Sequence, residues 1–290
     1  MLGGGYFAVI GAAALCALSF AAAKAYQQLT DNGTESGLKF NIITGAVTAA
    51  VFFAINGFGC EINGFSVLMA FAMAAFSSAY TMVGFKIMSC GKMSLYTIFL
   101  MIGGMVVPYI WGAVFWGERP DLMCTAGLFV LIAAVYAAHG EGKGTGAMLL
   151  ALCMTVFLLN GLVSVVSKAH QISQNAVSTL SFVILTGIAK AVICAAILVC
   201  TGKRDANNEK RKTPPRAFLY TALGAVLGGA SYQIQLKAAE TMPASVLYPL
   251  ITGGTIFCSA VIARLIFGEK ISKRIALSMA LCMLGVFLLV

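Results

Sequence analysis

One lysine of this sequence lies in an apolar segment, where burying a charge is energetically costly. Lys190 falls near the middle of the apolar run 176–200, and Thr179, Thr186 and Lys190 share one helical face at spacings of seven and four residues. A lysine deep in a membrane helix typically faces the protein interior or a wet cavity. Two interpretations stay open: Lys190 handles a substrate or a proton, or it bonds carbonyls and hydroxyls and holds its helix against the neighbours.

Uncharged polar side chains recur at helical spacing in other apolar runs. Asn160 and Ser164 are four residues apart, as are Ser231 and Gln235. Such residues bond neighbouring membrane helices or line a cavity, and for any single residue the first role is the commoner one. Together they predict a polar, uncharged-to-anionic lining of a central cavity. The predicted substrate-binding residues are Tyr80, Tyr96, Asn160, Ser164, Lys190, Ser231, Gln235, Tyr248 and Thr252.

Two prolines and the glycines near them mark places where apolar helices can bend. Pro108 and Pro249 remove backbone donors, and Gly103 and Gly253 lie a few residues away. The functional interpretation makes these four residues the hinges of two gating helices. The alternative is a fixed kink that packing requires.

Carboxylates are absent from the interiors of the apolar runs. Glu61, Glu118, Asp121, Glu240 and Glu269 all fall at predicted ends or in loops. Exchange of a lipophilic cation for protons usually needs a buried carboxylate, because an unpaired charge in hydrocarbon is costly. The sequence therefore disfavours that mechanism.

The sequence contains no pattern typical of an enzyme or a resident cofactor. A phosphate-binding loop, a serine elbow and metal-spaced histidines and acids are all missing. The nine cysteines are scattered, mostly inside apolar runs and without a CxxC pair, as expected of small core residues. We expect a non-enzyme with no cofactor and no metal site.

Composition places the chain in a membrane. Of the 290 residues, 60% are hydrophobic and 10% charged, whereas soluble domains carry roughly 25% charged residues. Apolar runs of about 20 residues alternate with short polar breaks, which indicates transmembrane helices. The net charge of +9 suits orientation in the membrane and anionic lipid headgroups, and no nucleic-acid partner is expected.

The chain contains one unit written twice. Ser94 aligns with Ser245, Gly103 with Gly254 and Gly117-Glu118 with Gly268-Glu269, all at an offset of 151 positions without a gap. A second match joins Lys24-Ala25-Tyr26-Gln27 to Lys168-Ala169-His170-Gln171 at an offset of 144. The predicted halves are residues 1–140 and 146–290.

Ten membrane spans are predicted, five in each half. The predicted spans are 5–24, 38–56, 65–85, 94–116, 121–139, 146–167, 176–200, 217–236, 244–267 and 274–290. Five is an odd number, so the second half must enter the membrane from the opposite side. This is the inverted-repeat plan of many secondary transporters, whose ligand site lies near the midplane.

The distribution of positive charge predicts the orientation. Most of the 19 lysines and arginines, Lys24 and Lys39 among them, are expected in loops after odd-numbered spans. Only Arg119, Lys168 and Lys237 are expected in loops after even-numbered ones. By the positive-inside rule both termini face outside a cell (inner) membrane.

The repeated blocks resemble the drug/metabolite transporter superfamily, and within it the EamA-like ten-helix group. The resemblance rests on Ser94 to Arg119, which ends WGERP, and on Ser245 to Arg274, which contains LYPLITGG and FGEKISKR. The Asn160-Gly161 and Lys168-Ala169-His170-Gln171 segments are also similar to members of this group. The resemblance implies a basket-like helical bundle and specifies the substrate poorly.

These observations predict an all-α integral membrane protein of ten transmembrane helices in two inverted five-helix repeats. Its expected function is that of a secondary transporter of a small polar metabolite such as an amino acid or a sugar. Two alternatives stay open: a multidrug exporter of the same fold, and a non-transporting membrane protein such as a scaffold. The expected partners are the small-molecule substrate and the bilayer, and the chain is expected as a monomer or a homodimer.

Overall fold

The computed structural model describes residues 2–30, 34–89, 93–115, 117, 122–138, 146–202, 214–239 and 244–288. All regular structure within these ranges is helical. The ten helices are α1 (Leu2–Leu29), α2 (Thr34–Ile55), α3 (Gly64–Ser89), α4 (Met93–Phe115), α5 (Leu122–Ala138), α6 (Gly146–Gln171), α7 (Thr179–Gly202), α8 (Pro215–Ala239), α9 (Ala244–Phe267) and α10 (Lys273–Leu288).

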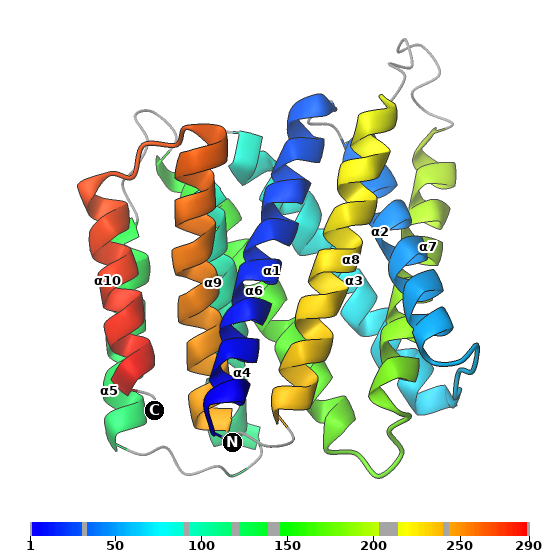
Figure 1. The fold of residues 1–290 in the computed structure, drawn as a ribbon, viewed down its shortest axis with the longest axis horizontal. Coiled ribbons are helices and arrows are strands. Elements are labelled where there is room, and N and C mark those ends of the chain that lie inside the picture. The colour runs from blue at the N-terminus through cyan, green and yellow to red at the C-terminus, as the bar shows by residue number, and fades with distance from the viewer. Residues whose placement is uncertain are drawn as a thin grey trace.

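The helices stand side by side in one bundle, and each predicted span overlaps one of them (Figure 1). Helices α5 and α10 pair at one side of the bundle, and α2 and α7 pair at the other (Figure 1). Helix α1 begins at the same end of the bundle at which α10 finishes. Successive helices alternate in direction along the chain, and α1 and α6 run opposite ways (Figure 1).

Length and apolarity suit these helices to a bilayer. Within the described ranges, seven of them are long and apolar enough to cross a membrane, namely α1, α2, α3, α4, α6, α7 and α9. A helix satisfies its backbone hydrogen bonds internally, which lipid cannot do for it. The chain is thus a multi-pass membrane protein.

Two helix ends differ from the sequence prediction. Helix α1 continues to Leu29 and α2 begins at Thr34, so Lys24 and Lys39 lie inside helices and not in a loop. The apolar pattern of the sequence stops at Lys24, but the helix continues. The charge of Lys24 is tolerated inside the helix because its side chain has a buried partner in the folded protein. Loop charge was therefore a poor guide to the helix boundary here.

The packing of the helices is nearly unchanged when the two groups of five are exchanged. Helix α1 packs on α8 and α9, and correspondingly α6 packs on α3 and α4. Helices α2 and α7, α4 and α9, and α5 and α10 each pack against their own counterpart. The contact between α2 and α8 likewise matches the contact between α7 and α3.

Helices α2 and α7 cross through a pair of glycines. A Cβ atom on Gly45 would lie 2.5 Å from the carbonyl oxygen of Gly187, and one on Gly187 would lie 2.8 Å from the carbonyl oxygen of Gly45. The neighbouring contacts are reciprocal too, with Ala191 beside Gly45 and Ala49 beside Gly187. Only glycine lets the two backbones approach this closely.

Helix α4 is packed unevenly along its length. Every residue from Met93 to Leu100 is buried, whereas Ile110, Val114 and Phe115 near the other end are 47%, 67% and 65% exposed. The buried half lies at the end of the bundle where α1 finishes. The other helices thus cover the start of α4 more completely than its end.

The glycine crossing generates a stability prediction. We expect Gly45→Ala to lower the free energy of unfolding by about 1–3 kcal/mol, because the added methyl group overpacks a backbone contact. The measurement is the thermal midpoint of the purified protein in detergent.

Gly11→Ala is the matched control, since a Cβ at Gly11 meets nothing within 4 Å. It should leave the midpoint unchanged or raise it slightly. Equal midpoints for the Gly45 variant and wild type would show that the two backbones do not approach as described.

Candidate functional site

A group of polar side chains lies where α1, α8 and α9 meet. The Ser231 hydroxyl donates to the carbonyl oxygen of Ala12 at 2.7 Å, and Gln235 Nε2 donates to Ser231 Oγ at 3.0 Å. The Cys16 thiol lies beside the hydroxyls of Ser231 and Thr255. These residues come from three helices of both halves, as a central site requires.

One member of this group has an unused hydrogen-bonding atom. Thr255 is fully buried, and apart from the Cys16 thiol, a weak hydrogen-bonding group, its Oγ1 has no hydrogen-bond partner within the described ranges. Gln233 Nε2 on α8 is also buried without a partner there. A buried polar atom is costly unless something satisfies it, so a ligand or a water molecule is the natural complement to Thr255.

Asn160 and Ser164 lie at a different contact, between α4 and α6. Asn160 Nδ2 donates to the carbonyl oxygen of Leu100 at 2.7 Å, and Ser164 Oγ donates to the carbonyl oxygen of Asn160 at 3.2 Å. A Cβ on Gly104 would lie 2.6 Å from Asn160 Nδ2. In this conformation Asn160 joins two helices, which is the packing role that the sequence left open.

The two predicted tyrosines belong to the buried cluster around α3 and α4. Tyr96 is 3% exposed, and its ring meets Phe20 edge-on with centroids 5.9 Å apart. Gly84 lies directly under the Tyr96 ring, because a Cβ there would be 2.4 Å from Tyr96. Tyr80 packs against the same cluster.

Lys190 lies apart from Ser231 and Gln235, at the crossing of α2 and α7. A Cβ on Gly45 would be 3.3 Å from the Cβ of Lys190. Close to this crossing, Asn41 Nδ2 donates to the carbonyl oxygen of Ser78 at 3.3 Å, while Asn41 Oδ1 and Thr44 Oγ1 have no partner within the described ranges. The structure contains two salt bridges within the described ranges, and neither involves Lys190.

The predicted hinge residues are partly described. Helix α4 continues through Pro108, and Gly103 packs so tightly on α6 that a Cβ would lie 2.2 Å from the carbonyl oxygen of Phe157. Thr252 and Gly253 are buried in α9. The side chains of Tyr248 and Pro249 lie outside the described part of the chain. Hinge motion at these residues stays a prediction.

A further polar contact was missed by sequence reasoning. Lys24 of α1 forms a buried ion pair with Glu269, which follows α9, and the Glu269 carboxylate also accepts hydrogen bonds at the N-terminus of α4. Both residues had been assigned to charged loops. The signal that could have found them is their recurrence, since Lys24 and Glu269 both belong to the repeated segments.

The recurrence of Tyr26 and His170 also has a physical explanation. The ring of Tyr26 packs on Phe40 of α2, and the ring of His170 stacks on Phe182 of α7, with centroids 5.0 Å and 3.8 Å apart. His170 also shares a hydrogen bond of 2.9 Å with Ser66 Oγ. Each repeated segment thus fastens the end of one helix to the start of the next by an aromatic ring.

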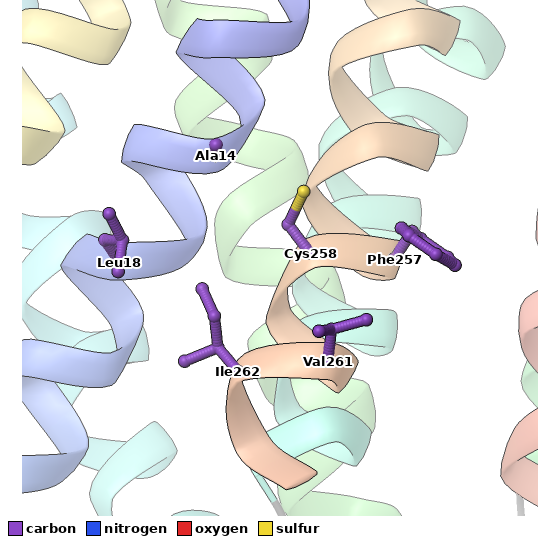
Figure 2. Close-up of a pocket in the computed structure, with 6 residues that line it drawn as sticks. All are labelled: Ala14, Leu18, Phe257, Cys258, Val261 and Ile262. Carbon is purple, nitrogen blue, oxygen red and sulfur yellow. The ribbon is translucent and has the colours of Figure 1, made fainter. Parts of the chain in front are cut away.

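An apolar cavity of about 200 Å³ opens between α1 and α9. Figure 2 shows Ala14 and Leu18 of α1 facing Cys258 and Ile262 of α9, and Phe257 and Val261 complete the lining. None of the predicted substrate-binding residues lines it. The cavity and the polar group use different sides of α1, because Ala14 and Leu18 are each two residues from Cys16 and such side chains project in nearly opposite directions from a helix.

Within the described ranges, no group of three or more histidines, cysteines or acids is close enough to hold a metal ion. The polar side chains of the group between α1, α8 and α9 offer hydrogen bonding.

Fold and composition define the class as a multi-pass helical membrane protein. The sequence model described as the EamA-like transporter family matches residues 145–290. The chain belongs to the EamA-like transporter family.

Two individual comparisons were found, of which the first agrees with this assignment. The chain is 31% identical over 102 residues to the probable 4-amino-4-deoxy-L-arabinose-phosphoundecaprenol flippase subunit ArnE of Enterobacter sp. (strain 638), a match that covers 34% of this chain and 92% of that protein. A crystal structure of a protein with no further description superposes with a TM-score of 0.62 at 15% identity, covering 94% of this chain and 97% of that chain. The second match concerns the fold alone.

The unpartnered hydroxyl of Thr255 generates a testable expectation. Thr255→Val should leave the free energy of unfolding unchanged or raise it by up to about 2 kcal/mol, because it removes a buried polar atom that has no partner. The measurement is the thermal midpoint of ligand-free protein in detergent.

Thr97→Val is the matched control, since Thr97 is fully buried and its Oγ1 donates to the carbonyl oxygen of Met93 at 3.0 Å. Losing that hydrogen bond should lower stability by about 1 kcal/mol. If both variants lose stability equally, Thr255 has a partner in the folded protein and is not poised for a ligand.

Proposed function

We propose that this protein is a secondary transporter that moves a small polar metabolite, an amino acid, a sugar or a related compound, by alternating access. The observation that carries the proposal is the buried Thr255 hydroxyl in the polar group between α1, α8 and α9, which within the described ranges has no neighbour for hydrogen bonding other than the weakly bonding Cys16 thiol. Membership of a transporter family supports the same function. Ser231 and Gln235 would complete the binding site beside Thr255.

The inverted repeat is part of the proposal. Exchanging the two groups of five helices maps nearly every packed pair onto another packed pair, and α1 and α6 run in opposite directions (Figure 1). The reciprocal contact of Gly45 and Gly187 would lie on the pseudo-two-fold axis that relates residues 1–140 to 146–290. Rocking one half against the other around a central site is the usual mechanism of such a plan.

The proposal includes ten spans, with α5, α8 and α10 crossing as well. Ten crossings return the chain to the side on which it began, in keeping with α1 starting and α10 finishing at one end of the bundle (Figure 1). By the distribution of lysine and arginine, that side is the outside of the cell membrane. The protein would act as a monomer or a homodimer.

A second candidate is the flipping of a lipid-linked sugar. The cavity between α1 and α9 is lined by apolar side chains alone, as a site for the hydrocarbon chain of such a lipid would be, while the sugar would occupy the polar group on the other side of α1 (Figure 2). The similarity to a protein described as a flippase subunit supports this candidate. Transport of a polar metabolite remains the first candidate, because the observation on Thr255 concerns polar atoms alone.

Reconstituted liposomes test the first proposal. We expect protein-dependent movement of at least one component of a mixture of amino acids and sugars, read by mass spectrometry of the liposome contents. Gln235→Leu should lower that movement about tenfold, because it removes a hydrogen-bonding group at the site.

Gln28→Leu is the matched control, because Gln28 is exposed at the end of α1. No movement of any component by folded protein would overturn the first proposal. Movement of a lipid-linked sugar alone would favour the second candidate, and raised tolerance to lipophilic cations that is insensitive to Lys190→Ala would favour a multidrug exporter. Failure of all three readouts would favour a scaffold.

Lys190 allows a test of substrate charge. If Lys190 faces an anionic group of the substrate, Lys190→Met should lower transport of that substrate about tenfold, while Lys190→Arg should retain most of it. Transport rates of anionic and neutral components, measured in the same liposomes, provide the comparison. A purely structural lysine would instead lower the thermal midpoint and affect every substrate equally.

A further inference from the structure

Glu269 joins three parts of the chain through one carboxylate. Its Oε1 forms an ion pair with Lys24 Nζ and accepts a hydrogen bond of 2.9 Å from the backbone N–H of Met93. Its Oε2 accepts from the backbone N–H of Ser94 at 3.4 Å and from Ser94 Oγ at 3.1 Å. The carboxylate therefore caps the N-terminus of α4, where a negative charge is favoured.

The ion pair is buried. The side chains of Lys24 and Glu269 are 3% and 9% exposed, and Lys24 Nζ lies 4.7 Å from the centre of the Phe267 ring. Removing either charge would leave the other uncompensated in a poorly solvated place, which is strongly unfavourable. This contact differs from the exposed pair of Lys39 and Glu35, both on α2, whose side chains are 37% and 55% exposed.

A turn at the end of α9 places the carboxylate. Gly268 has a φ of 63°, and the backbone N–H of Glu269 donates to the carbonyl oxygen of Ala263 at 3.1 Å. This is the glycine-dependent ending of a helix, and it folds Glu269 back toward the bundle. Gly117 takes the same conformation after α4, with a φ of 66°.

The contact also joins the two halves of the chain at one end of the bundle. Lys24 and Ser94 belong to the first half, and Glu269 belongs to the second. A layer of apolar residues, Ala21, Met93 and Ala263 with Phe267 against them, lies around it. The fully buried part of α4, from Met93 to Leu100, begins at this contact.

We propose that Lys24, Glu269 and Ser94 form a latch that holds this face of the transporter closed. The latch rests on the proposed alternating access, because opening this face would separate the second half from α1 and α4. Glu269 would then leave both Lys24 and the α4 N-terminus. The latch is cytosolic if the termini face outside.

The residue types of the latch recur in the other half. Lys168 and Ser245 stand where Lys24 and Ser94 stand in the first half, and Glu118 stands at the position of Glu269. Glu118 lies outside the described part of the chain, so the latch is defined by Lys24, Glu269 and Ser94 alone.

Labelling of Cys16 reports opening of this face. Cys16 lies eight residues, about 12 Å along α1, deeper than Lys24 and beside the central polar group. In proteoliposomes, a membrane-impermeant maleimide should reach Cys16 from the latch face about tenfold faster in Glu269→Gln and Lys24→Met than in wild type. Mass spectrometry of the Cys16 peptide measures the rate.

Two internal references make the rate interpretable. Cys200 is exposed at the end of α7 on the latch face, so its labelling identifies the molecules that present this face to the reagent. Glu35→Gln removes the exposed ion pair on α2 and should leave Cys16 labelling at the wild-type rate.

The latch is overturned if the Glu269 and Lys24 variants fold and Cys16 labelling from this face does not change. It is equally overturned if Glu35→Gln produces the same increase. If neither charged variant yields monodisperse protein, Ser94→Ala decides, because it removes one hydrogen bond and should increase labelling about two- to threefold. No increase in that variant also overturns the latch.

Labelling needs no substrate, so the latch and the proposed function fail separately. A protein that transports no metabolite but shows faster Cys16 labelling in the variants retains the latch and loses the function. A protein that transports a metabolite while labelling stays unchanged retains the function and loses the latch.

Discussion

Lipid offers no hydrogen bonds, and that constraint determines most of this structure. Each segment within the bilayer must satisfy its own backbone, which a helix does and a loop cannot. Helices cannot then gain stability by hiding apolar surface from water, because lipid tails are as apolar as leucine. They associate through close packing and through the few polar side chains that find partners. The crossing of α2 and α7 at Gly45 and Gly187 is the clearest example of close packing.

The polar side chains follow from the same constraint and divide into two kinds. Asn160 and Ser231 have partners on neighbouring helices, at Leu100 and Ala12, and they hold the bundle together. Thr255 and Asn41 each keep a buried atom without a partner within the described ranges. In a medium where an unsatisfied polar atom is costly, such atoms are candidates for contact with a ligand or a water molecule.

A transporter must also have contacts that are strong and yet reversible. Aliphatic contacts between the halves respond little to a charge that comes near them. An ion pair that also caps a helix, in contrast, is either formed or broken. The contact of Glu269 with Lys24 and with the start of α4 has this property, and it joins the two halves at one face only. The apolar cavity between α1 and α9 opens at the surface of the bundle, where Phe257 of its lining is 52% exposed.

The sequence by itself determined the helical class, the approximate helices and the family. These depend on composition and on the repeated segments, both of which can be read along the chain without knowing its tertiary contacts. Apolar runs of bilayer length, for example, predict α3, α6 and α7 well. The tertiary structure decided which polar residues meet. The predicted binding residues whose side chains the structure describes fall into separate groups, with Lys190 near α2, Asn160 against α4 and Gln235 beside Ser231. Only the structure revealed that Lys24 and Glu269, 245 positions apart, are partners. The physical reason is that periodicity shows only which face of a helix is polar. The partner of a polar side chain depends on how the helices cross. Crossings such as that of Gly45 with Gly187 join residues far apart in the chain.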